Sequence, residues 1–200
     1  MKREIRIPNQ TRAIEKKRKL TEVAYQLFNE KGYNNINTAD IAAAAGLSTG
    51  CLYDYFIDKE DIFLDAVKIH NEEIRGIVKN RLQKISMDAD LLEILQAFVE
   101  VLLEAHNHTQ GFQREVMALS MTNPQISNLL EEYNQPETVE RMISFFEAHG
   151  IHMEHAKERI LLFLNVTDEM CHHILYRTNI WCDTEIYKEE CIQMLMHLFC

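Results

Sequence analysis

The chain has 200 residues, of which 46% are hydrophobic, with only six glycines and three prolines. The apolar side chains recur at helical rather than alternating spacing, which predicts an all-helical protein and argues against a fold built on a sheet. The net charge of −10 is unevenly distributed: residues 1–56 hold nine Lys and Arg against six Asp and Glu, whereas residues 57–200 hold twelve against twenty-five. A nucleic-acid partner is therefore compatible with the N-terminal part in spite of the acidic total.

The cysteines and the hydropathy of the chain indicate in which cellular compartment the protein is expected. The five cysteines form no CxxC pair, and an odd count at irregular spacing does not indicate a disulfide framework. The first ten residues lack an apolar signal core, and no segment approaches the ~20 uninterrupted apolar residues that a membrane span needs. We therefore expect a soluble, cytoplasmic protein with no membrane partner.

The first predicted helix follows a loose basic arm, residues 1–10. It presents one apolar face, formed by Leu20, Val23, Ala24, Leu27 and Phe28. Gly32 is expected to end this helix, because glycine accepts the left-handed conformation common at helix C-termini without steric cost.

Two short helices are predicted next, over residues 38–45 and 48–55. Asn37 is placed to cap the first of them, with Asp40 three residues later as in a capping box. Only Gly46 and Leu47 separate the two helices, so they must cross steeply, as in a helix-turn-helix. Their small inner face would comprise Ile41, Ala45, Leu47, Leu52 and Phe56.

Longer helices are predicted from residue 59 onward, over 59–83, 90–107, 111–121, 124–149, 154–178 and 184–199. Pro124 suits the first position of a helix, and Gly150 marks the end of the same helix. The prediction is thus an all-α protein of about nine helices, in which a three-helix N-terminal domain precedes a larger helical domain.

Residues 20–63 carry a set of spaced features that resembles the N-terminal DNA-binding domain of the TetR repressor family. The matching positions are Ala24, Phe28, Gly32, Ile41, Ala42, Ala45, Gly46, Ser48, Gly50, Leu52, Tyr53, Phe56, Lys59 and Glu60. The resemblance implies a DNA-binding domain over residues 1–56 and a ligand-binding and dimerisation domain over 57–200. It also implies a repressor, associated with the nucleoid, that a small-molecule ligand releases from a pseudo-palindromic, double-stranded DNA operator.

The resemblance also implies which residues contact the operator. Bases would be contacted by Thr38, Thr49, Gly50 and Tyr53, and the phosphate backbone by Asn37, Cys51, Tyr55 and Lys59, with Ser48 completing the predicted DNA-binding set. A short helix with small residues at its start can enter a major groove about 12 Å wide. The same residues have a structural alternative, since a tyrosine often buries its ring and Gly50 could simply allow close packing.

Asp54 departs from the pattern, because a carboxylate that faces DNA would repel the phosphates. Our preferred interpretation is that Asp54 points away from the DNA and caps or pairs within the domain. Otherwise, operator affinity would depend more on the basic stretch 16–19 and on the arm residues Lys2, Arg3, Arg6 and Arg12. About half of that stretch is expected to touch DNA, because four consecutive charges point around more than one helix face.

The acidic remainder is expected to supply the dimer and the signal. By the resemblance, the last two long helices would pair with those of a second copy, and an internal cavity would hold an unidentified small molecule. Candidate cavity residues are His70, Phe98, Leu102, Phe112, Met117, Met121 and Tyr133, although core packing is an alternative role for each.

Other functional classes were weighed against this one. A TetR-fold DNA binder without a small-molecule ligand remains an alternative, as does a metal-, haem- or redox-responsive regulator that uses the histidines, Cys51 or Cys171. The spacing of the nine histidines does not favour a metal: Gly150 separates His149 from His152, and a Glu-x-x-His motif ending at His172 has no second copy. No cofactor or metal is expected. No HExxH, GxSxG, P-loop or GxGxxG pattern occurs, so an enzyme is not expected either.

Overall fold

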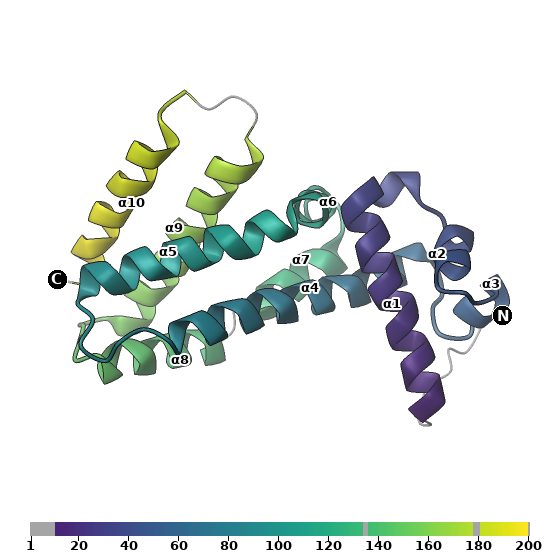
Figure 1. Ribbon diagram of the computed structural model, residues 1–200, viewed down its shortest axis with the longest axis horizontal. Coiled ribbons are helices and arrows are strands. Elements are labelled where there is room, and N and C mark those ends of the chain that lie inside the picture. Colours follow the sequence, from purple (N-terminus) through teal and green to yellow (C-terminus); the bar gives the residue numbers. More distant parts are fainter. Residues whose placement is uncertain (1–10, 134–135, 178–180, 200) are drawn as a thin grey trace. The chain divides into compact units, whose positions relative to one another are not determined.

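Figure 1 shows the computed structural model of the chain, which describes residues 11–133, 136–177 and 181–199. All regular structure in these ranges is helical, as predicted. The helices are α1 (Thr11–Lys31), a short 3-10 helix η1 (Tyr33–Asn35), α2 (Thr38–Ala44), α3 (Thr49–Leu52), α4 (Lys59–Leu82), α5 (Leu91–His108), α6 (Gln110–Ser120), α7 (Pro124–Tyr133), α8 (Pro136–Ala148), α9 (Ala156–Tyr176) and α10 (Thr184–Phe199). None of these helices is long and apolar enough to cross a membrane.

The helices form two compact units. The first contains residues 11–73 and 109–129 of the described chain, which are α1 to α3, the first part of α4, α6 and the beginning of α7. The second contains residues 74–108, 130–133, 136–177 and 181–199 of the described chain, with the rest of α4, then α5, the end of α7, α8, α9 and α10. The assignment of DNA binding to 1–56 and of ligand binding and dimerisation to 57–200 stays a prediction.

The core of the first unit is built on the predicted apolar face of α1. Leu20, Ala24 and Phe28 are fully buried. The Phe28 ring meets the Phe63 ring of α4 edge to face at 5.3 Å between centroids, and the Phe63 ring lies 5.1 Å from the Phe112 ring of α6. Aromatic side chains from three helices therefore hold α1, α4 and α6 together.

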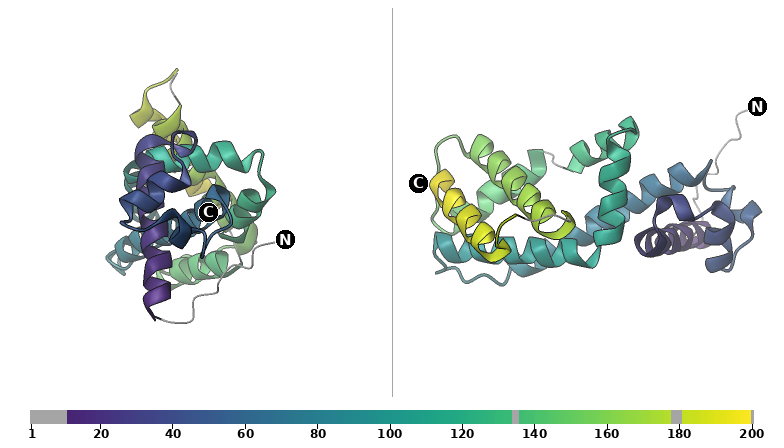
Figure 2. Two further views of the ribbon diagram at one scale, coloured as in Figure 1. Left: turned by 90° about the vertical axis from the view of Figure 1, so that its right-hand side faces the viewer. Right: turned by 90° about the horizontal axis from the view of Figure 1, so that it is seen from above.

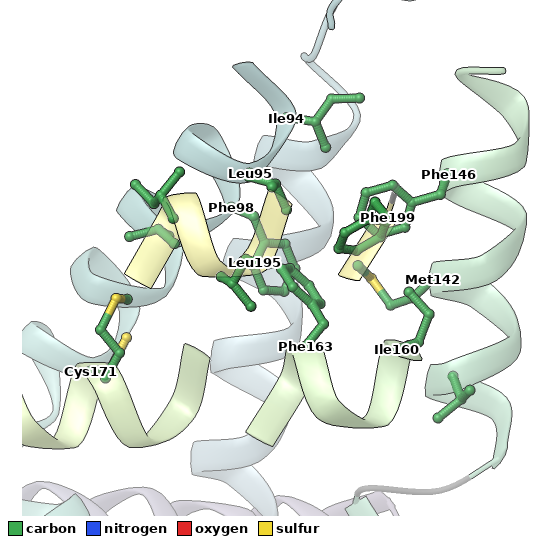
Figure 3. Close-up of a cluster of buried hydrophobic side chains, with 14 residues drawn as sticks. Ile94, Leu95, Phe98, Met142, Phe146, Ile160, Phe163, Cys171, Leu195 and Phe199 are labelled. Carbon is green, nitrogen blue, oxygen red and sulfur yellow. The ribbon is translucent and has the colours of Figure 1, made fainter. Parts of the chain in front are cut away.

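The core of the second unit joins α5, α8, α9 and α10, and Figure 3 shows part of it. The Phe98 ring lies 4.7 Å from that of Phe163, and the Phe146 ring lies 4.5 Å from that of Phe199. All four rings are at most 6% exposed. Within this unit α9 and α10 lie side by side, as Figures 1 and 2 show.

Two sequence expectations need correction. The single helix predicted over 124–149 is two helices, α7 and α8, and Pro136 is the first residue of α8, a position that proline favours. The described residues contain ten α-helices, in line with the prediction of about nine. The helix predicted over 48–55 ends at Leu52, because the backbone then tightens into bonds from Asp54 to Cys51 and from Tyr55 to Leu52.

Candidate nucleic-acid interface

The two short helices α2 and α3 are held by caps that the sequence predicts. The Asn37 side chain accepts hydrogen bonds from the backbone N–H groups of Ala39 and Asp40, and the Asp40 carboxylate accepts one from the Asn37 N–H at 2.9 Å. This is a complete capping box. The Ser48 hydroxyl accepts a bond from the Cys51 N–H at 3.2 Å and caps α3 in the same way.

The turn between α2 and α3 requires a special backbone conformation at one residue. Gly46 has a φ of 67°, in the left-handed region that favours glycine. The N–H of Leu47 then bonds to the Ala42 carbonyl at 2.9 Å and closes the end of α2. Of the five residues predicted for the inner face, Leu47 is only partly buried, and four are buried: Ile41, Ala45, Leu52 and Phe56. The helix-turn-helix is therefore a small folded unit with its polar side chains on the outside.

Most of the predicted DNA-contacting residues lie on that outer side. Asn37, Ser48 and Gly50 are exposed, while Thr38, Thr49, Cys51 and Tyr53 are partly exposed. The Thr38 and Tyr53 hydroxyls lie 3.0 Å apart and form a hydrogen bond, which sequence reasoning had not anticipated. It ties the first residue of α2 to the residue after α3, so the two helices present a single polar surface.

Tyr55 and Lys59 have a different environment. Tyr55 is only 6% exposed, so its ring contributes to the core. The Lys59 ammonium donates to the carbonyls of Tyr33 and Ile36, at 2.9 Å each, and lies 4.0 Å from the centroid of the Tyr33 ring. Burial lowers the pKa of Lys59 from its ordinary value, partly offset by the negative charge of Glu115. Lys59 thus anchors α4 to the loop after α1, and a phosphate contact from it stays a prediction.

The basic stretch of α1 is partly engaged inside the protein. Lys17 forms an ion pair with Asp65 of α4 at 2.6 Å, and its ammonium lies 5.2 Å from the centroid of the Phe56 ring. Together with Lys68, Lys17 holds the pKa of Asp65 below its ordinary value, although burial of that carboxyl acts in the opposite direction. Lys17 is therefore a helix-to-helix contact, whereas Lys19 is exposed. The arm residues Lys2, Arg3 and Arg6 lie outside the described residues.

Asp54 is exposed, and its carboxylate makes no hydrogen bond or ion pair with the part of the chain that the structure describes. The cap or internal pair that the sequence analysis preferred for it is therefore not found among these residues.

A contact between α1 and α6 was missed by the sequence analysis. The backbone N–H of Phe112, in the first turn of α6, donates to the Asn29 side chain of α1 at 2.9 Å. Beside it, a Cβ on Gly111 would lie only 2.1 Å from the Asn29 carbonyl oxygen. The available signal was the glycine at the start of a predicted helix, where no glycine is otherwise required.

His70, one of the predicted ligand residues, lies at the same junction. It is 1% exposed, and its Nε2 lies 2.7 Å from Oε1 of Gln113 on α6. Its Nδ1 lies 3.4 Å from the Tyr25 hydroxyl, which donates to Glu73 at 2.9 Å. Burial lowers the pKa of His70, partly offset by the Gln113 bond and the Glu73 charge, and burial raises that of Tyr25. The polar atoms of His70 therefore face neighbouring side chains of the first unit.

The predicted ligand residues are distributed over both units. In the first unit Phe112 is buried, Met117 is partly buried and Met121 is 87% exposed. In the second unit Phe98 belongs to the core and Leu102 packs against it, while the Tyr133 side chain lies outside the described residues. Surface hollows of about 320 and 200 Å³ occur in the first and second units respectively, and neither is lined by these residues.

The fold and the exposed surface of α2 and α3 define a helix-turn-helix protein. Comparison with known proteins narrows this class, since residues 20–66 match the family model described as bacterial regulatory proteins, tetR family. A curated HTH-type transcriptional regulator of Staphylococcus aureus is 42% identical over 50 residues, which are 25% of this chain and 27% of that protein. The HTH-type transcriptional regulator BetI of Cronobacter sakazakii is 27% identical over 117 residues, 57% of each protein.

The alignments with these two curated relatives thus span 27% and 57% of the relatives' own lengths. Solved structures match over far more of the chain. A TetR-family transcriptional regulator from Mesorhizobium loti has a TM-score of 0.68 at 18% identity and covers 94% of this chain and 97% of its own. A multidrug binding protein solved with imidazole has the same TM-score at 17% identity and covers 98% of each. Residues 20–66 thus match the tetR family of bacterial regulatory proteins, and nearly the whole chain shares the fold of the TetR-family regulator from Mesorhizobium loti.

Proposed function

We propose that this chain is a homodimeric, sequence-specific DNA-binding regulator, acting on the nucleoid in the cytoplasm, that represses transcription until a small-molecule ligand releases it from its operator. The observation that carries the proposal is the surface of α2 and α3, where Thr38, Thr49 and Tyr53 are partly exposed beside the exposed Gly50. Hydroxyl groups on such a surface can form hydrogen bonds with base edges in the major groove and with phosphates. The caps and the Thr38 to Tyr53 bond hold these groups before any DNA is bound, which lowers the entropic cost of recognition.

Apolar side chains on the last two helices support the dimer. Leu161 and Leu162 of α9 are 40% and 51% exposed, and Ile186 and Met194 of α10 are 59% and 49% exposed. Large apolar groups grouped on adjacent helices favour burial against a partner, and a second copy of the chain offers the same surface. A two-fold dimer would read a pseudo-palindromic operator with half-sites about 34–36 Å apart. Leu162→Glu is expected to shift the purified protein from dimer to monomer in light scattering.

The junction of α1 with α6 supports the proposed response to a ligand. Because α6 contacts α1 through Gly111 and Asn29, a ligand that displaces α6 would also act on α1, the helix that packs against α2 of the helix-turn-helix. Such a ligand lowers DNA affinity only if it binds the conformation with α6 displaced more tightly than the DNA-binding conformation. The related fold of the multidrug binding protein, solved with imidazole, supports a small molecule as the signal.

The proposal is tested by selecting bound sequences from random DNA with the purified full-length chain. We expect enrichment of an inverted repeat, and loss of binding when metabolite extract is added. If the dimer neutralises about eight phosphates, the logarithm of the DNA-binding constant should fall with the logarithm of the salt concentration at a slope near −7. No enrichment would refute DNA binding, whereas enrichment that no extract abolishes would support the ligand-independent alternative.

A matched pair of variants separates recognition from folding. Thr49→Ala removes a hydroxyl from the proposed interface and is expected to weaken binding to the selected DNA by about 10-fold or more, because a specific base contact is worth about 1–3 kcal/mol. Thr122→Ala removes an exposed hydroxyl just after α6 and should leave affinity unchanged. Equal affinities of the two variants would contradict the proposed interface.

A further inference from the structure

Three metal-binding side chains from distant parts of the sequence meet in the second unit. His106 lies near the end of α5, and Asp168 and His172 lie one turn apart on α9, the helix against which α5 packs. Nε2 of His106 is 3.5 Å from Oδ1 of Asp168, and Nε2 of His172 is 3.7 Å from Oδ2 of the same carboxylate. One potential ligand atom from each residue lies within 4.8 Å of the other two.

These separations are close to those that a metal ion requires. For bonds of about 2.0–2.1 Å in tetrahedral geometry, neighbouring ligand atoms are about 3.4 Å apart. The two contacts of Asp168, at 3.5 and 3.7 Å, are near this value but long for direct hydrogen bonds. Small adjustments of the side chains would therefore bring all three ligand atoms onto one ion.

A fourth side chain, Tyr176, favours one tautomer of His106. The Tyr176 hydroxyl donates to the backbone carbonyl of His106 at 3.2 Å, and its oxygen lies 3.2 Å from Nδ1 of the same residue. The hydroxyl has a single proton and the carbonyl can only accept, so the hydroxyl oxygen accepts a bond from the Nδ1–H. In the neutral ring Nε2 then carries the lone pair, and it is Nε2 that faces the Asp168 carboxylate.

A lone pair that faces a carboxylate oxygen is repelled unless a proton or a metal ion lies between them. Histidines that bind metals usually donate their other ring N–H to an acceptor that orients them, and Tyr176 supplies such an acceptor for His106. The arrangement thus resembles a metal ligand with its outer support already in place.

The exposure of the three residues gives an ion a route to the cluster. His106 is 4% exposed and the His172 side chain 13% exposed, whereas the Asp168 side chain is 54% exposed. The carboxylate therefore lies at the surface and the imidazoles below it. Two imidazoles and one carboxylate suit borderline divalent ions such as Zn²⁺, Co²⁺ or Ni²⁺ better than Mg²⁺ or Ca²⁺, which prefer oxygen ligands.

We propose that His106, Asp168 and His172 bind a divalent transition-metal ion, with Tyr176 as a positioning residue that orients His106. No metal was expected from the sequence, because Gly150 separates His149 from His152 and the motif from Glu169 to His172 has no second copy. Glu169 instead forms an ion pair with Arg177 at 2.8 Å, and the aspartate one position earlier lies beside His172. The proposal goes beyond the proposed function, since it concerns metal binding and requires no operator.

The experiment is a Co²⁺ titration of the tag-free, chelator-treated full-length protein. We expect one equivalent of Co²⁺ to produce the visible d–d absorption of low-symmetry four-coordinate Co²⁺, and Zn²⁺ to abolish it by competition. Asp168→Asn and His172→Ala should weaken binding by more than about 100-fold, since loss of an outer-shell partner alone costs about 10- to 100-fold.

Two neighbouring residues provide matched controls for the ligand variants. Glu169→Gln and His173→Ala change the same residue types one position along α9, where Glu169 pairs with Arg177 and the His173 ring stacks on Tyr187 at 4.6 Å. Both should bind Co²⁺ like the unaltered protein. Because Asp168 is half-exposed, its asparagine variant is expected to keep the helical circular dichroism and remain testable even where a His106 variant does not fold.

The proposed role of Tyr176 in orienting His106 is tested separately. Tyr176→Phe removes the hydroxyl while keeping the ring, and it should weaken Co²⁺ binding by about 10-fold without loss of helicity. Absence of the visible band, equal affinities of Asp168→Asn and Glu169→Gln, or a thiolate charge-transfer band that shows cysteine ligation would each overturn the proposal. These readouts involve no DNA, so a failed operator selection leaves them interpretable.

Discussion

The two compact units use buried and exposed side chains in different ways. In the first unit, short helices carry polar groups on the surface, and capping bonds between residues three or four apart hold them in place. In the second unit, longer helices bury a core of phenylalanines. There the polar cluster joins His106 of α5 to Asp168 and His172 of α9, more than sixty positions further along the chain. A surface made by local contacts can be found from sequence spacing, whereas a cluster made by tertiary packing cannot.

The largest expected effect is in the core of the second unit. Phe163 is fully buried and touches the rings of Phe98, Phe146 and Phe199. Phe163→Ala should destabilise the protein by about 3–5 kcal/mol, because the cavity cannot be filled by any one neighbour. Amide hydrogen exchange should then accelerate in α5, α8, α9 and α10. If hydrogen exchange accelerates as much in α1 and α6 as in these four helices, the two units unfold together and do not differ in stability.

The corresponding test in the first unit is Gly111→Ala. A Cβ at this position would lie 2.1 Å from the backbone carbonyl of Asn29, a clash that α6 can relieve only by moving away from α1. We expect a loss of about 3 kcal/mol, at the upper end of the usual overpacking cost, and faster hydrogen exchange in α1 and α6. Gly76→Ala is the matched control, because no atom lies within 4 Å of its Cβ and alanine is the better helix former. Equal melting temperatures of the two variants would refute the close contact.

Lys59 tests whether a predicted DNA-contacting residue also stabilises the fold. Lys59→Ala removes two hydrogen bonds from an ammonium group to carbonyls, and should cost about 2 kcal/mol of stability in urea unfolding. Lys19→Ala removes the same charge from an exposed position on α1, so its effect should be confined to DNA affinity and its salt dependence. If Lys59→Ala leaves the urea midpoint unchanged, the anchoring role is wrong.

These cases show why some features could be predicted and others could not. Asn37, Asp40 and Gly46 act through neighbours only a few residues away, so spacing alone predicted the caps and the turn. Pro136 was a visible signal for the start of α8 and was overlooked. The roles of Gly111 and His106, by contrast, depend on which helices pack together, and the apolar spacing of a helix identifies its buried face but not its partner.

His70 offers a smaller effect, which depends on pH. Because burial depresses its pKa in the folded protein, the unfolded chain binds the extra proton first as pH falls. Stability should therefore be at its full value above the ordinary histidine pKa of 6.5 and decrease as pH falls below it towards the lowered folded value. His70→Gln should flatten this decrease in urea midpoints measured from pH 7.5 to 5, whereas the exposed His152→Gln should not. An unchanged slope in the His70 variant would assign the dependence to another group.

The smallest expected effect concerns Asp54, the exposed carboxylate in the turn that follows α3. Asp54→Asn removes one negative charge from each half of the proposed interface while keeping the size of the side chain. If the carboxylate faces the phosphates, the variant should bind the selected operator more tightly, by about 2- to 5-fold at low salt, and the gain should shrink as salt screens the charges. Asp88→Asn, an exposed aspartate in the second unit, controls for the change in net charge. If affinity does not change in Asp54→Asn, the side chain is directed away from the DNA, and the proposed surface narrows to α3 and the beginning of α2.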